Sequence, residues 1–165
     1  MGLRFFELDT TYDRDDFDCG VPELNKFLKN DARQQQSKNL NRTFVLTNDK
    51  DNPLKILAYY SISMCEVTLY SLPESYKKKL PRYPIPAARI GRLAVDQEQQ
   101  KNGFGKLCLI DALKRIKIVS SSIGVYAVIV DAKNDKARGF YEYYGFISFV
   151  DDPLSLFIPL SRVND

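Results

Sequence analysis

Gln100-Lys101-Asn102-Gly103-Phe104-Gly105-Lys106 is a glycine-rich stretch that joins two apolar segments, one at 89–96 and one from about 103 to 121. The composition of the first segment predicts a strand, and the spacing of the second predicts a helix. The glycines thus fall at a helix N-terminus, where backbone N–H groups lack intrahelical partners and bind anions. Glycine lets the main chain approach a phosphate closely, and the two lysines add positive charge. We expect this loop to bind a diphosphate.

Two familiar glycine loops do not fit this stretch. A dinucleotide-binding fingerprint needs a parallel strand with an acidic tip about 20 residues further on, and no such strand ends at that spacing. A Walker loop needs glycine at position 100 and Ser or Thr at 107, where this chain has Gln100 and Leu107. The remaining pattern is Gln-x-x-Gly-x-Gly, for which an ordinary tight turn is the alternative interpretation.

This pattern between a strand and a helix resembles the acetyl-CoA pyrophosphate loop of the GNAT superfamily of N-acetyltransferases. The likeness continues downstream, where 125–131 reads as a buried strand and 134–146 resembles the second cofactor helix of that family and the strand after it. Upstream, the segments 17–28, 41–45 and 84–96 resemble one branch, the TacT-like toxins. The resemblance covers nearly the whole chain.

The order of the predicted elements indicates an α/β fold with a mixed sheet of about six to seven strands and helices on both faces, as in GNAT proteins. Residues 1–165 are expected to form a single acetyltransferase domain. The parallel crossover from 89–96 to 125–131 should be right-handed. A helix is expected from 18 or 22 to about 38, and the prolines of 73–86 predict a loop. The other expected strands are 3–8, 43–47, 56–68, 147–150 and 156–160.

Composition limits the cellular location and the metal chemistry that we expect of this protein. No apolar run approaches the roughly 20 residues of a membrane span, and the N-terminus does not read as a signal peptide, so we expect a cytoplasmic protein without membrane contact. Cys19, Cys65 and Cys108 are odd in number and lack metal-ligand spacing, and the chain has no histidine. We expect reduced thiols and no metal.

The resemblance assigns site residues. It implies that the hydroxyl of Tyr141 protonates the leaving CoA thiolate, that Asn134 as helix N-cap binds the pantetheine arm, and that Phe140 belongs to the cofactor site. It also implies a β-bulge that frees backbone groups of Leu93, Ala94 and Val95 for the acetyl carbonyl and pantetheine. The loop residues assigned to the cofactor are Gln100, Lys101, Asn102, Gly103, Phe104, Gly105 and Lys106. On spacing alone, Tyr141 reads as one more core aromatic.

The chain offers no obvious general base, because it lacks histidine and the 89–96 segment has no carboxylate before Asp96. A lysine amine, with a pKa of about 10.4, would need such a base far more than an α-amine, whose pKa is about 7.7–8. The absence therefore favours an α-amine as acceptor, although Glu66 or an ordered water remains open as base.

Charge is unevenly spread around a net value of +3. A basic middle segment contains no acid between Tyr76 and Val95, whereas the N-terminal part is acidic. A basic face attracts RNA phosphates, and a solvated surface is the alternative. The candidate tRNA contacts are Lys77, Lys78, Lys79, Arg82, Arg89 and Arg92.

Together these features predict an enzyme that moves the acetyl group of acetyl-CoA to the α-amine of aminoacyl-tRNA and so blocks translation. Resemblance to the TacT-like branch further implies a toxin, a homodimer, and a ribbon-helix-helix antitoxin as partner. Two alternatives stay open. One is an acetyltransferase for protein N-termini or a small amine. The other is a non-catalytic protein, either a binding or regulatory module that keeps the CoA site or an antitoxin-docking subunit.

Overall fold

The computed structural model describes residues 2–82 and 84–164. By its internal contacts the chain divides into two compact units. The described residues of 1–63 and 91–112 form the first unit, and those of 64–90 and 113–165 form the second. Strands β3 (Ala58–Val67) and β4 (Ile85–Val95) and helix α4 (Phe104–Val119) each contribute residues to both units.

Among the residues that the structure describes, seven strands form one mixed sheet in the order β1-β2-β3-β4-β5-β7-β6. Strands β1/β2, β2/β3, β5/β7 and β6/β7 are antiparallel, and β4 pairs with β5 in parallel from Ala87↔Ala127 to Ile90↔Val130. This confirms the predicted mixed sheet and the predicted parallel pair. The remaining strands are β1 (Leu3–Glu7), β2 (Arg42–Asn48), β5 (Ala127–Asp131), β6 (Ile147–Ser148) and β7 (Ser155–Pro159).

The first helical region is interrupted by a wider turn. Helix α1 (Pro22–Lys26) continues through a π-helical segment, η1 (Phe27–Asp31), into α2 (Ala32–Ser37). The prediction of helix in this region is confirmed from Pro22 onward, and proline fits the first turn because its missing N–H would have had no partner there. The π segment was not predicted, because it leaves apolar spacing almost unchanged.

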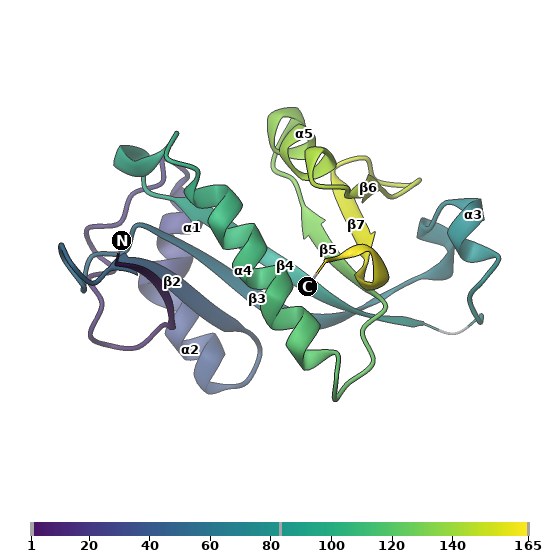
Figure 1. Ribbon diagram of the computed structural model, residues 1–165, viewed down its shortest axis with the longest axis horizontal. Helices are drawn as coiled ribbons and strands as arrows, with labels where there is room; N and C mark the ends of the chain where they lie inside the picture. Colours follow the sequence, from purple (N-terminus) through teal and green to yellow (C-terminus); the bar gives the residue numbers. More distant parts are fainter. Residues whose placement is uncertain (1, 83, 165) are drawn as a thin grey trace. The chain divides into compact units, whose positions relative to one another are not determined.

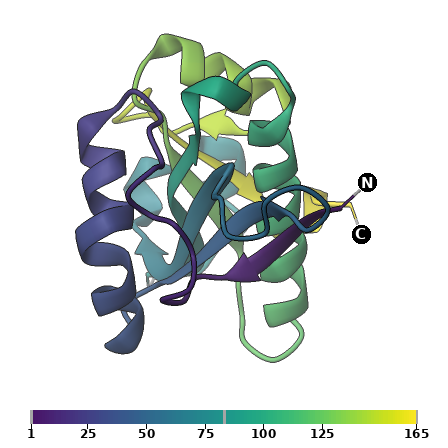
Figure 2. The same cartoon turned by 90° about the vertical axis from the view of Figure 1, so that its left-hand side faces the viewer.

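In the first unit, alternation along the strands sends side chains to two layers of helix. Val45 and Tyr59 are paired and pack in one core with Phe27 of η1. Their neighbours face the other way: the hydroxyl of Tyr60 donates to a carboxylate oxygen of Asp111 in α4 at 2.6 Å. Figure 2 shows the α1–α2 helix on one side of β2 and the start of α4 on the other. Helices thus cover both faces, as predicted.

In the second unit, β5, β7 and β6 follow one another across the sheet (Figure 1). Ile129 and Phe157 lie in its core together with Leu72 from the segment before β4. The expected loop over 73–86 was wrong in part, since it contains helix α3 (Glu74–Lys77) and the first two residues of β4. Pro73 stands just before the first turn of α3, and Pro86 keeps its carbonyl for the N–H of Tyr126, so neither proline breaks its element.

Candidate functional site

The glycine-rich stretch forms a turn that ends in a helix N-terminus, as predicted. Gly103 and Lys101 both have left-handed backbone conformations, with φ of +78° and +79°. Helix α4 begins at Phe104, and Leu107 donates its N–H to the carbonyl of Gly103 at 3.2 Å. The N–H groups at 104–106 precede the first full turn and have no carbonyl four residues back within the helix. The lysine side chains at 101 and 106 are exposed. Donors and mobile cations therefore gather at one helix end.

Gln100 holds this turn in place. Its amide Nε2 donates to the carbonyl of Val95 at 3.2 Å and to the carbonyl of Cys19 at 3.4 Å. These bonds connect the loop with the end of β4 and with the segment before α1. In the sequence Gln100 was assigned to the cofactor, and the structure gives its side chain an anchoring contact within the protein as well.

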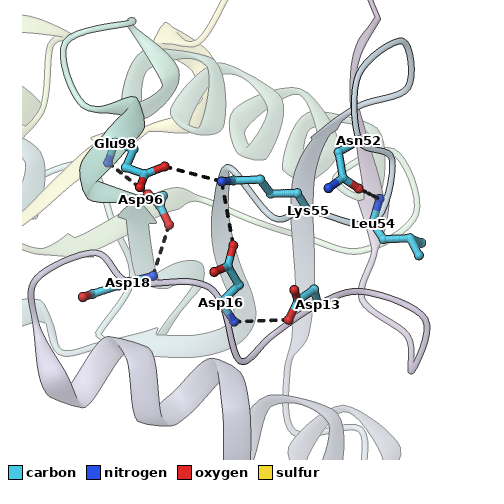
Figure 3. Close-up of polar contacts among 8 residues, drawn as sticks. All are labelled: Asp13, Asp16, Asp18, Asn52, Leu54, Lys55, Asp96 and Glu98. Carbon is cyan, nitrogen blue, oxygen red and sulfur yellow. Dashed lines mark hydrogen bonds and ion pairs between the residues drawn. The ribbon is translucent and has the colours of Figure 1, made fainter.

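A buried carboxylate holds the start of the same turn by hydrogen bonds. Asp96 is 5% exposed and accepts the N–H of Asp18 at 3.1 Å and the N–H of Glu98 at 3.0 Å. Figure 3 shows these bonds beside Lys55, whose Nζ lies 3.5 Å from Glu98 and 3.8 Å from Asp16. Sequence reasoning missed this role, although a lone acid directly after an apolar strand was visible.

The bulge predicted for β4 lies in the part of the strand that belongs to the first unit. Ala94 is buried there, in the same core as Tyr59 of β3. Leu93 and Val95 are half-buried. The bulge and the role of Leu93–Val95 in binding stay predictions.

Helix α5 (Asp135–Tyr143) has the ends that the sequence predicts. Oδ1 of Asn134 accepts the N–H of Ala137 at 2.9 Å, which is the N-cap bond. Gly145 follows the helix with φ of +97°, a conformation that favours glycine. Because Oδ1 of Asn134 accepts the cap bond, the amide NH₂ is the part of this side chain that can donate a hydrogen bond to a ligand.

Tyr141 differs from its aromatic neighbours in burial. Its side chain is 7% exposed, and the structure makes it the buried residue of α5, whereas Tyr143 is 82% exposed. The Tyr141 ring makes T-shaped contacts with Phe140 at 5.2 Å and with Phe146 at 5.6 Å between centroids. Packing on two sides fixes the ring plane, and a fixed ring gives its hydroxyl a defined position.

Glu66 is exposed at the end of β3. It lines a pocket of 230 Å³ in the second unit together with Arg89 and Asp151. The guanidinium of Arg89 forms an ion pair with Asp131 at the end of β5. The structure gives Glu66 a place in a polar pocket, and its role as base stays a hypothesis.

The six basic residues predicted to contact tRNA fall into two groups. Arg89 is paired with Asp131, Arg92 lies over the ring of Phe27 at 3.7 Å, and Lys77 lies 3.8 Å from Glu74. These contacts give the three side chains structural partners. The side chains that are exposed to solvent are Lys78, Lys79 and Arg82.

The three cysteines carry thiols and are not joined in disulfides. Cys19 and Cys108 are buried and Cys65 is half-buried. Burial raises the pKa of Cys108, and it raises that of Cys65 although Arg89 opposes the shift. A raised pKa disfavours the reactive thiolate at neutral pH. Within 2–82 and 84–164 no group of Cys, Asp or Glu side chains is placed to hold a metal ion. No helix among the described residues is long and apolar enough to cross a bilayer.

Comparison with known families and proteins adds a second line of evidence. Residues 81–155 match the acetyltransferase (GNAT) domain family. A tRNA-acetylating toxin of Mycobacterium tuberculosis is 32% identical over 86% of this chain and 82% of its own length. A probable toxin TacT of Sinorhizobium fredii is 28% identical over 93% of this chain and 88% of its own length.

Solved structures agree with these relatives. A Tyr-to-Phe mutant of KacT superposes with a TM-score of 0.91 at 30% identity, covering 98% of this chain and 96% of that one. AtaT complexed with acetyl-methionyl-tRNAfMet gives 0.89 at 32% identity, over 96% and 95% of the two chains. AtaTR bound with acetyl-CoA gives 0.84 at 32% identity, over 97% and 95%. An AtaT mutant bound to the C-terminus of the antitoxin AtaR gives 0.82 at 28% identity, over 98% and 95%.

Proposed function

Because this chain belongs to the TacT-like toxins of the GNAT acetyltransferases, we propose that it transfers the acetyl group of acetyl-CoA to the α-amine of an aminoacyl-tRNA. The observation that carries the proposal is the tRNA-acetylating relative, which matches 86% of the chain at 32% identity. The acetylated α-amine has no lone pair available for peptide-bond formation, so the reaction stops translation.

The glycine-rich turn is the proposed site of the acetyl-CoA diphosphate. The helix end at Phe104 offers backbone N–H donors, and Lys101 and Lys106 offer mobile positive charge. Gln100 and Asp96 hold the turn to the rest of the first unit. Asn102, Gly103 and Gly105 complete the set that the resemblance assigns to the cofactor.

The chemistry requires one bond to form and one to break. The neutral α-amine attacks the thioester carbonyl carbon, and a backbone N–H at Leu93–Val95 stabilises the oxyanion that forms. Collapse of this intermediate breaks the C–S bond. Tyr141 gives its phenol proton to the CoA thiolate, and the amine loses its extra proton to water or to Glu66. Asn134 and Phe140 orient the pantetheine arm beside that hydroxyl.

The tightly packed ring of Tyr141 supports its role as acid. A phenol has a pKa of about 10 and a thiol one of about 8.5, so transfer to the thiolate depends on accurate placement of the two groups. The ring contacts with Phe140 and Phe146 supply a fixed orientation.

The proposal extends to assembly and partners. We assign residues 1–165 to a single acetyltransferase domain, since two strands and one helix contribute to both compact units. The complex of AtaT with the antitoxin AtaR supports an antitoxin partner here. Following the family, we propose that this partner is of the ribbon-helix-helix class, and that the toxin is a homodimer acting in the cytoplasm on tRNA.

Competition between acceptors tests the proposal. The purified protein is incubated with labelled acetyl-CoA and matched amounts of bulk aminoacyl-tRNA, a tripeptide with a free N-terminus, and spermidine. We expect label on tRNA that mild alkali releases as N-acetyl amino acid. Labelled tripeptide or spermidine beside unlabelled tRNA would overturn the proposed substrate.

A further inference from the structure

A groove in the second unit combines aromatic and basic side chains. It has a volume of 490 Å³ and lies beside the turn that carries η2 (Leu69–Ser71). This volume falls within the range of about 300–1,000 Å³ that is usual for ligand sites. The groove is lined by Thr68, Leu69, Tyr70, Lys77, Arg82 and Pro84.

Tyr70 is the most conspicuous side chain of this groove. It is 82% exposed, so its ring packs against little of the protein. The turn beneath it is nevertheless held firmly: Ser71 donates its hydroxyl to Asp151 at 3.0 Å, and its carbonyl accepts the N–H of Val150 at 3.1 Å. Leu72 is buried in the core of the second unit. A solvent-exposed ring on an anchored turn is a ready stacking surface.

The charge around this ring is positive. The ammonium group of Lys77 lies 5.6 Å from the centroid of the Tyr70 ring, and Arg82 is exposed. Lys78 and Lys79 are exposed on the same segment. Glu74 is the single acidic residue in the sequence between positions 67 and 95. The exposed pair of Glu74 with Lys77 is weak, and it leaves Lys77 available to an anionic ligand.

We propose that this groove binds the unpaired 3′ end of the tRNA, with one base stacked on Tyr70 and the neighbouring phosphates on Lys77 and Arg82. An exposed aromatic ring flanked by basic side chains is the arrangement that binds single-stranded nucleic acid. Double-stranded RNA offers phosphates but no unstacked base, and so would leave the ring unused. The inference rests on the proposed function, because it takes aminoacyl-tRNA as the substrate.

Truncation of the ring tests the groove. Binding of uncharged tRNA is compared with binding of the same tRNA trimmed of its unpaired 3′ nucleotides, for the unmodified protein, Tyr70→Ala and Tyr70→Phe. We expect Tyr70→Ala to raise the Kd for full-length tRNA about 5- to 100-fold, the effect of losing one stacked base. Trimmed tRNA should bind all proteins equally weakly, and Tyr70→Phe should bind like the unmodified protein.

Tyr143→Ala is the matched control, because Tyr143 is equally exposed, at 82%, and belongs to the same unit. It should leave the Kd unchanged. If Tyr70→Ala binds full-length tRNA as tightly as the control does, the groove does not hold the 3′ end. If instead it loses affinity equally for full-length and trimmed tRNA, the ring does not hold the 3′ end and the inference is wrong.

A kinetic comparison separates this inference from the proposed function. Tyr70→Ala should raise KM for aminoacyl-tRNA and leave acetylation of an amino-acid methyl ester, which lacks RNA, unchanged. Unchanged KM for aminoacyl-tRNA in an active Tyr70→Ala protein would overturn the groove alone. Absence of tRNA acetylation in the unmodified protein would overturn the proposed function, and the inference with it.

Discussion

At the scale of single residues, Lys101 shows a conflict between backbone conformation and side chain. Its φ of +79° lies in the left-handed region, which costs an L-residue roughly 1–2 kcal/mol. Gly103 takes the same conformation without that cost. A strained residue at a site of this kind points to a use for its side chain, here the positive charge beside the α4 N-terminus.

Replacing Lys101 separates strain from charge. Lys101→Gly relieves the backbone strain, and we expect the free energy of unfolding to rise by about 0.5–1 kcal/mol once the added chain entropy is deducted. The same change removes the charge, so acetyl-CoA should bind about 5- to 20-fold more weakly. Denaturant unfolding and titration calorimetry give the two values.

Lys101→Gln is the control for this experiment, because it removes the charge and keeps the strain. It should lose the same acetyl-CoA affinity without gaining stability. Equal acetyl-CoA affinity in all three proteins would mean that Lys101 contributes nothing to the diphosphate site.

At the scale of elements, the turn between β4 and α4 depends on one buried carboxylate. Asp96 accepts N–H groups from Asp18 and Glu98, and its own N–H donates to the carbonyl of Leu57 at 3.0 Å. Asp96 therefore connects three parts of the chain: the segment before α1, the residue just before β3, and the first turn after β4. The position of the glycine loop follows from these bonds.

Asp96→Asn should loosen this turn. The amide NH₂ of asparagine would face one of the two N–H donors, which leaves a buried donor without an acceptor and costs about 1–3 kcal/mol. We expect a lower unfolding midpoint in urea and weaker acetyl-CoA binding, with kcat little changed at saturating acetyl-CoA. Asp16→Asn, at an exposed position of the same cluster, serves as control. Unaltered affinity in a destabilised Asp96→Asn protein would show that the turn does not depend on this carboxylate.

Periodicity and end residues made most elements predictable. The cap at Asn134 and the glycine at 145 located α5, and apolar runs located β4 and β5. The π segment at Phe27–Asp31 and helix α3 were missed, because a single wider turn and a four-residue helix leave little periodic pattern. Asp96 was missed because its partners, Asp18 and Glu98, come together only through the fold.

The site was predictable to the extent that local sequence defines it. The helix N-terminus at Phe104 follows from the glycine pattern, and the structure has it there. Spacing alone made Tyr141 a core aromatic, and its burial agrees with that, so its role as acid came from the resemblance and not from the spacing. The division of the basic residues into paired and exposed side chains depends on tertiary packing.

At the scale of the whole molecule, acidic and basic residues are unequally distributed between the two units. The acidic N-terminal residues belong to the first unit, whereas Lys77, Lys78, Lys79 and Arg82 belong to the second. A net charge of +3 attracts RNA only weakly as a whole, so local concentration of basic groups has to provide the attraction. The second unit carries both this basic segment and Tyr141.

The central claim is that the chain acetylates aminoacyl-tRNA with Tyr141 as the acid. The most direct test is the rate of labelled acetyl transfer to bulk aminoacyl-tRNA for the unmodified protein, Tyr141→Phe, and Tyr143→Phe as a control that removes an exposed phenol from the same helix. We predict that Tyr141→Phe lowers kcat at least about 100-fold, within the range for loss of a general acid, and keeps its affinity for acetyl-CoA. Tyr143→Phe should keep its rate. A folded Tyr141→Phe protein that labels aminoacyl-tRNA at the unmodified rate would contradict the account.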